Sequence, residues 1–118
     1  MDYDILEKSL LAHKGSRKEF PFGPEAAVFK VAGKMFALVA WTDEPLRITL
    51  KSDPEEADFL RTQYASIVPG YYMNKKHWNT ITLDSSIPDD LLIDLIEISY
   101  SLVVRGLKKA ERLKISEG

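Results

Sequence analysis

The spacing of hydrophobic positions changes several times along this chain, and each spacing predicts a different element. Residues 2–13 place apolar side chains at helical intervals before Gly15, which predicts an opening helix. Residues 46–51 alternate between apolar and polar side chains, as a half-buried strand does. Helices and strands therefore occupy separate segments, which is the pattern of an α+β protein.

A first β-hairpin is predicted just before that strand. Residues 28–31 and 34–41 flank Ala32 and Gly33, and Gly33 supplies the positive φ that a two-residue turn demands. Because residues 34–41 are apolar on both faces, we expect a central strand that is covered at least partly on both sides. We also expect Phe36 of this strand, and Leu95 of a later helix, to lie in the core.

Two later helices have recognisable starts. Asp53 as N-cap, Pro54 at the first helical position and Glu56 two positions later predict a capping box and a helix to about Tyr64. Pro88 begins a longer closing helix with a wide apolar face. That face comprises Leu91, Leu92, Leu95, Ile96, Ser99, Leu102, Val103 and Leu107.

A second hairpin lies between these two helices. Residues 67–73 and 77–83 are predicted strands, joined by a turn at 74–76. Residues 14–19 are polar and are expected to be a connector. The predicted order is helix, three strands, helix, two strands and a long C-terminal helix, with the helices packed on antiparallel sheet in one domain, 1–118.

Composition is that of a soluble globular protein. The chain has 118 residues, of which 45% are hydrophobic and 29% charged, and it has no cysteine, which excludes disulfides and thiolate sites. No segment has the length and apolar character of a membrane span, and the N-terminus carries acids instead of a signal peptide. We expect a cytoplasmic protein with no membrane partner, and a monomer.

The net charge is −2, but acidic and basic residues are concentrated in separate segments of the chain. Residues 84–97 contain five anions and no cation, whereas residues 105–114 contain five cations and one anion. On a single helix, acids at the N-terminus and bases at the C-terminus complement the helix dipole. A basic landing patch is the alternative interpretation.

Sequence motifs for catalysis or cofactor binding are absent. The glycines stand alone at turns, so no phosphate loop is formed, and the two histidines have no metal-ligand spacing. No nucleophile-elbow sequence accompanies the serines. We therefore expect a protein that is not an enzyme, with no metal and no cofactor.

The second hairpin gathers an unusual set of side chains, and these are the candidate binding residues. Lys75 and Lys76 lie at the predicted turn, and Lys30 and Lys34 flank the turn of the first hairpin. Aromatic rings stand beside the second turn, from Tyr72, His77 and Trp78. Lysines can contact phosphates and aromatic rings can stack or wedge. The alternative is that the tyrosine and the tryptophan are core anchors and that the lysines only solubilise turns.

Five segments carry a family resemblance in the same order. They are residues 21–23, 29–37, 50–54, 69–78 and 99–103. Together they resemble the MmcQ/YjbR family. The resemblance implies a small bacterial cytoplasmic protein with a CyaY-like α+β fold, also described as a double wing, in which two hairpin-bearing lobes flank a concave sheet. It also implies DNA binding, since members are generally labelled as DNA-binding proteins.

Two functional classes remain open from the sequence. The first is a DNA-binding protein that contacts the nucleic-acid backbone with its two hairpin wings. The second is a module that binds a protein or peptide with an exposed sheet face and its aromatic cluster. The salt dependence of the binding affinity distinguishes these two classes, because phosphate contacts weaken steeply as salt is added and apolar contacts do not.

Overall fold

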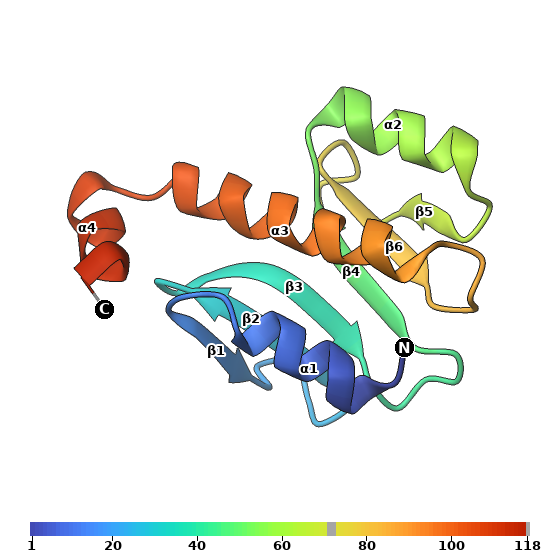
Figure 1. The fold of residues 1–118 in the computed structure, drawn as a ribbon, viewed down its shortest axis with the longest axis horizontal. Coiled ribbons are helices and arrows are strands. Elements are labelled where there is room, and N and C mark those ends of the chain that lie inside the picture. The colour runs from blue at the N-terminus through green and yellow to red at the C-terminus, as the bar shows by residue number, and fades with distance from the viewer. Residues whose placement is uncertain (71–72, 118) are drawn as a thin grey trace.

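The computed structural model describes residues 1–70 and 73–117 (Figure 1). The elements in chain order are α1 (Tyr3–Leu11), β1 (Ser16–Glu19), β2 (Ala26–Val31), β3 (Lys34–Ala40), β4 (Arg47–Lys51), α2 (Pro54–Gln63), β5 (Ile67–Pro69), β6 (Trp78–Thr82), α3 (Asp89–Arg105) and α4 (Lys109–Glu117). The strands form one antiparallel sheet in the order β1-β2-β3-β4-β6-β5. The predicted α+β class is confirmed, with one strand and one helix more than the sequence indicated.

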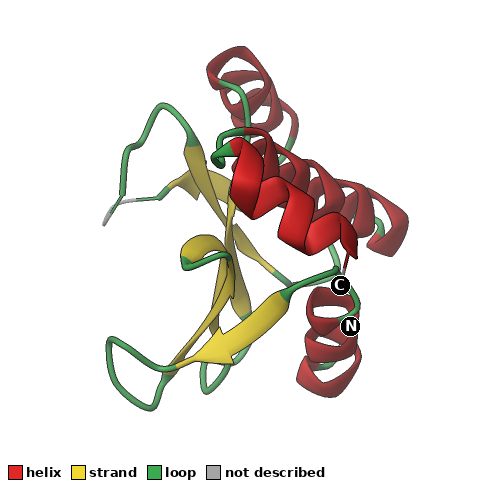
Figure 2. Cartoon of the chain, turned by 90° about the vertical axis from the view of Figure 1, so that its left-hand side faces the viewer, coloured by secondary structure: helices red, strands yellow, loops and turns green. Residues whose placement is uncertain are grey.

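The helices lie on one side of the sheet, as Figure 2 shows. The opposite side, here called the open face, carries the alternate residues of the strands. A row across its middle consists of Val28, Leu38, Thr49, Thr80 and Val68, which are cross-strand neighbours from β2 to β5. β3 is covered by helices on one face alone, but Met35 and Leu38 on its open face are half-buried, so the expected cover of at least part of both faces is met without a second layer of helices. Its position inside the sheet, between β2 and β4, is as predicted.

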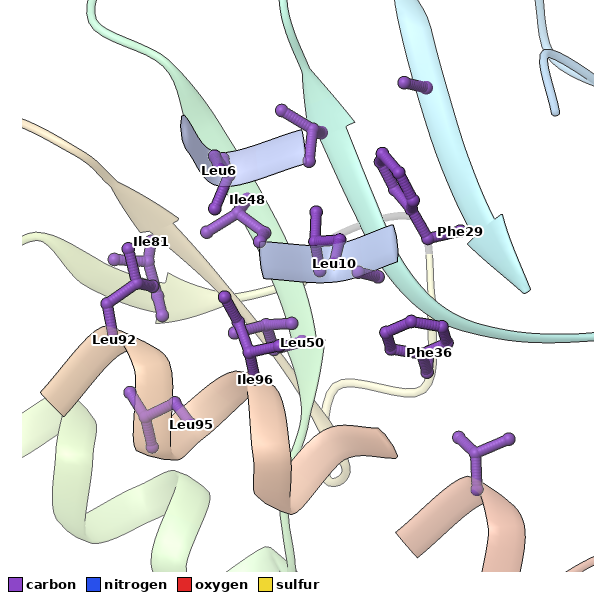
Figure 3. Packing of buried hydrophobic residues seen from close by; sticks show 14 of the residues in the cluster. Leu6, Leu10, Phe29, Phe36, Ile48, Leu50, Ile81, Leu92, Leu95 and Ile96 are labelled. Carbon is purple, nitrogen blue, oxygen red and sulfur yellow. The ribbon is translucent and has the colours of Figure 1, made fainter. Parts of the chain in front are cut away.

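The core fills the space between the sheet and the helices (Figure 3). Leu6 and Leu10 project from α1, and Leu92 and Ile96 project from α3, at the spacings that place them on one helix face. Figure 3 shows them converging on the strand residues Phe29, Ile48, Leu50 and Ile81. Phe36 and Leu95, both predicted core residues, are 0% and 4% exposed.

The polar segment 14–19 is a strand for most of its length, and the prediction of a connector there is wrong. β1 pairs with β2 at the edge of the sheet, with Ser16 opposite Val31 and Glu19 opposite Val28. An edge strand needs only main-chain hydrogen bonds on one side and leaves its side chains in solvent. Its sequence therefore carries no apolar alternation.

The closing helix is shorter than predicted. α3 ends at Arg105, Gly106 is its C-cap residue, and α4 begins at Lys109. The amide of Gly106 donates to carbonyls of the last turn of α3. The dipole interpretation of the basic segment therefore fails for Lys108 and Lys109, because they lie before and at the positive end of α4.

The start of α2 also differs from the predicted capping box. Asp53 is the N-cap residue and Pro54 is the first helical residue, as expected, but the Asp53 side chain makes no capping hydrogen bond. Its carbonyl instead accepts from the amide of Ala57, at 2.8 Å. The preceding residue, Ser52, donates its amide to the carbonyl of His77 at 2.7 Å, so main-chain contacts fix this junction.

Candidate nucleic-acid interface

Basic side chains line one end of the open face. The strand register places Arg17 of β1 opposite Lys30 of β2, and Lys30 opposite Met35 of β3. β3 and β4 separate at this end of the sheet. Beyond the point of separation, Lys51 of β4 lies opposite Trp78 of β6. Because directly opposite residues have Cβ atoms about 4.5–5.5 Å apart, each of these pairs is in side-chain contact range.

A buried hydroxyl keeps the gap between β3 and β4 open. Ala37 lies opposite Leu50, and the same register would place Phe36 opposite Lys51. Instead, Ser99 of α3 stands between them. Its Oγ donates to the Phe36 carbonyl at 2.6 Å and accepts from the Lys51 amide at 2.9 Å. The hydroxyl thus replaces the direct hydrogen bond that would have continued the ladder.

A hollow of about 370 Å³ opens where the two strands separate, and we call it the Trp78 hollow. It is lined by Lys34, Met35, Lys51, Trp78, Leu102, Val103, Gly106 and Leu107. The first four belong to the strands, and the rest belong to the C-terminal end of α3 and the turn that follows. A lysine of the first hairpin and the tryptophan of the second therefore share one site.

Arg17, Lys30 and Lys51 on the open face, together with Lys34 at the start of β3 beside the Trp78 hollow, form what we call the basic patch. Lys30 has an acidic partner, because its Nζ lies 3.5 Å from Oε1 of Glu19. The other three make no ion pair with any residue in the described part of the chain. Most of the charge of this patch is therefore free to attract an anion.

A second hollow continues the patch onto α4. It has a volume of about 600 Å³, and its charged lining consists of Arg17, Lys30, Lys114, Glu19 and Glu111. Three cations and two anions leave this hollow weakly positive. The basic character is therefore strongest between Arg17 and the Trp78 hollow and declines toward α4.

The other end of the open face has different electrostatics. Arg47 lies on β4, four residues before Lys51 and on the same face. Its Nη2 is 2.7 Å from Oδ2 of Asp43, so its charge is compensated locally. The free positive charge on β4 is thus confined to the end that reaches the Trp78 hollow.

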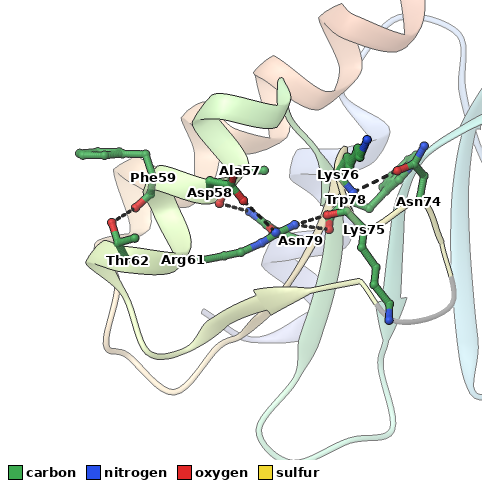
Figure 4. Close-up of polar contacts among 10 residues, drawn as sticks. All are labelled: Ala57, Asp58, Phe59, Arg61, Thr62, Asn74, Lys75, Lys76, Trp78 and Asn79. Atoms are coloured by element: carbon green, nitrogen blue, oxygen red, sulfur yellow. Dashed lines mark hydrogen bonds and ion pairs between the residues drawn. The ribbon is translucent and has the colours of Figure 1, made fainter.

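Arg61 of α2 fixes the loop that precedes β6 (Figure 4). Its guanidinium donates to the carbonyls of Lys75 and Trp78, the latter at 3.3 Å, and Nε donates to Oδ1 of Asn79 at 2.6 Å. Nη1 also bonds to Asp58, at 3.1 Å. One side chain therefore ties α2, the loop and the start of β6 together.

The predicted second wing is only partly confirmed. β5 and β6 are shorter than the predicted strands, and residues 75–77 form a turn. Lys75 and Lys76 are exposed there, but Figure 4 shows their side chains pointing in different directions. His77 is half-buried. Tyr72 lies outside the described residues.

Sequence reasoning missed two members of the basic patch. Arg17 was placed in a connector because an edge strand has no apolar pattern. Lys51 was correctly expected to face solvent, but its neighbour Trp78 is 27 residues away in the chain. Only the pairing of β4 with β6, which the sequence left open, brings them together.

Within residues 1–70 and 73–117, no three acidic or histidine side chains gather as metal ligands. No helix in the same part of the chain is long and apolar enough to cross a bilayer.

The fold and the site define a class: an α+β protein with helices on one face of an antiparallel sheet and a basic patch on the other. The YjbR family model matches residues 11–102, and the chain belongs to the YjbR family. The family resemblance drawn from the five sequence segments is confirmed.

Named relatives agree with this assignment. The chain is 44% identical over 99 residues to the uncharacterised protein YbdF of Escherichia coli O157:H7, covering 84% of this chain and 81% of that one. It is 32% identical over 112 residues to the uncharacterised protein YjbR of Escherichia coli K12, covering 95% of both. These relatives establish the family without assigning a function.

Solved structures support the fold. A Deinococcus radiodurans protein with a DUF419 domain matches with a TM-score of 0.92 and 43% identity, over 98% of this chain and 88% of that one. A Pseudomonas syringae protein matches with a TM-score of 0.75 and 28% identity, over 86% and 98% of the two chains.

Proposed function

We propose that this protein binds DNA by placing the sugar–phosphate backbone against the basic patch. The observation that carries the proposal is that Arg17 and Lys51 lie on the open face, that Lys34 lines the Trp78 hollow beside Lys51, and that none of the three has an ion-pair partner in the described residues. The role is binding, without catalysis, and it needs no metal or cofactor.

The dimensions of the patch suit a phosphate backbone. β1 and β4 are separated by three strand spacings, or about 14 Å across the sheet. One DNA strand advances about 3.4 Å along the helix axis per phosphate, so this width equals about four nucleotide steps measured along that axis. Contacts of this kind position DNA and carry no sequence information. Lys75 and Lys76 are secondary contacts in this proposal.

A peptide-binding module is the second candidate. The middle of the open face has an apolar component, since Leu38 and Val68 are only half-buried there. An apolar contact of this kind would be almost insensitive to salt.

Salt dependence tests the proposal most directly. Affinity for labelled duplex and single-stranded DNA is measured by fluorescence anisotropy over a range of salt concentrations. Each lost phosphate contact is expected to flatten the log–log slope on duplex DNA by about 0.9. Arg17→Gln and Lys51→Gln should each do so and weaken binding to all sequences equally.

Arg47→Gln is the matched control, because Arg47 shares the strand and face of Lys51 but is compensated by Asp43. It should leave affinity and slope unchanged. The proposal is wrong if the wild type binds no DNA at low salt. It is also wrong if Lys51→Gln and Arg17→Gln both keep the wild-type slope.

A further inference from the structure

We propose that the Trp78 hollow holds one unpaired nucleobase of DNA while the adjoining phosphate lies against Lys34 and Lys51. This inference rests on the proposed function and names the form of DNA that the site selects. It predicts a preference for single strands, or for duplexes from which a base has been extruded, over intact duplex.

The hollow has the composition of a nucleotide site. Its volume of about 370 Å³ lies within the range of about 300–1,000 Å³ that is usual for small-molecule pockets. Trp78 and Met35 offer an aromatic ring and a polarizable thioether, and the end of α3 adds aliphatic side chains. Nucleobases stack on aromatic side chains regardless of their sequence, because each base has a π-face.

The charge of the hollow selects an anion. Of the described residues that line it, two are cations and none is an anion. A neutral apolar ligand would leave both lysines without a counterion. An inorganic phosphate would in turn leave the aromatic and aliphatic walls in water. A ligand with a flat apolar part and an attached phosphate satisfies both.

The backbone of Trp78 is fixed by its neighbours, while its indole N–H makes no hydrogen bond to a described residue. Gly70 packs on it so closely that an added Cβ would lie 3.2 Å from the Cβ of Trp78, and Arg61 holds its carbonyl. No described residue accepts a hydrogen bond from its indole N–H, whereas the indole of Trp41 donates to the Pro24 carbonyl at 2.7 Å. The Trp78 N–H is therefore available to a ligand.

The hollow is also preformed. Its opening between β3 and β4 depends on the Ser99 hydroxyl, whose two hydrogen bonds are made inside the protein and need no ligand. Binding would then require little reorganisation of the sheet, which lowers its free-energy cost.

Tryptophan fluorescence provides the first test. The chain has two tryptophans, so Trp41→Phe leaves Trp78 as the single reporter. Titration with thymidine monophosphate should change the Trp78 emission in a saturable way. Inorganic phosphate at the same concentrations should not. An emission that does not respond to the nucleotide would overturn the inference.

Affinity for different DNA forms provides the second test. Stacking on an aromatic residue contributes about 1–3 kcal/mol per base, so Trp78→Leu should weaken single-stranded DNA binding about 5- to 150-fold. Blunt duplex binding should be unchanged, and Trp78→Phe should retain part of the single-strand affinity. Circular dichroism and urea midpoints confirm that each variant is folded.

The outcomes separate this inference from the proposed function. If Trp78→Leu is folded and binds single strands as well as the wild type does, the inference fails and backbone binding by the patch stands. If no DNA binds at low salt but the mononucleotide still saturates the Trp78 signal, the hollow is a nucleotide site and the proposed function fails.

Discussion

Replacing Ser99 with alanine tests the most specific feature of this sheet. The Ser99 side chain is completely buried, and its Oγ is bonded both to the Phe36 carbonyl and to the Lys51 amide. Alanine fits in the same space but offers neither a donor nor an acceptor. Ser99→Ala therefore leaves two main-chain polar groups without their partner at the point where β3 and β4 separate.

The expected cost follows from those two groups. A buried donor or acceptor left without a partner costs about 1–3 kcal/mol. Two such groups predict a loss of about 2–6 kcal/mol, which falls to about 1–3 kcal/mol if water reaches one of them. If β3 and β4 instead close and form the missing rung between Phe36 and Lys51, the cost falls below about 1 kcal/mol, since one hydrogen bond then replaces two.

Urea denaturation followed by circular dichroism measures this difference, provided that the m value is unchanged. Ser101→Ala is the matched control, because Ser101 lies two residues further along α3 and is exposed. It should change the free energy of unfolding by less than about 0.5 kcal/mol. If Ser99→Ala has an equally small effect and also leaves the fluorescence of Trp78 unchanged, the strands have not closed, the hydroxyl does not hold them apart and the account of the Trp78 hollow is wrong.

Two further predictions concern the loop and the first helix. Arg61→Lys removes the planar fork that reaches the carbonyls of Lys75 and Trp78, and should lower the free energy of unfolding by about 1–3 kcal/mol in urea; wild-type stability would contradict the role given to this arginine. Burial, followed by the hydrogen bond to Glu7, raises the pKa of Tyr3 from 10.0 to about 12. Because the folded state holds the phenol proton more tightly, this stabilisation is complete below pH 10 and is lost as the pH rises toward 12. Unfolding midpoints measured across that window should fall for the wild type and fall less for Tyr3→Phe, and equal slopes would refute the assignment.

Much of the fold was predictable because apolar spacing reports burial directly. Leu6 and Leu10 recur at the interval of one helix face, and both are fully buried. The same signal identified Phe36 and Leu95 as core residues. It failed for β1, where main-chain pairing with β2 holds a strand whose side chains face solvent.

The candidate site was less predictable, because it depends on strand order. Lys34 and Trp78 were both expected to bind, but on two separate wings. The insertion of β4 between β3 and β6 brings the two wings to one hollow. No local pattern in the sequence specifies that order, and the role of Ser99 as a spacer depends on it as well.

The two edge strands of the sheet, β1 and β5, are both poorly suited to pairing with a strand of another molecule. β1 presents a charged edge with Arg17, Lys18 and Glu19, and β5 is only three residues long and ends at Pro69, which has no amide hydrogen. Short, charged or proline-containing edges resist the addition of a strand from another chain. Copies of this protein should therefore not join their sheets edge to edge into fibrils at high concentration. A partner that reaches the sheet must approach across its open face.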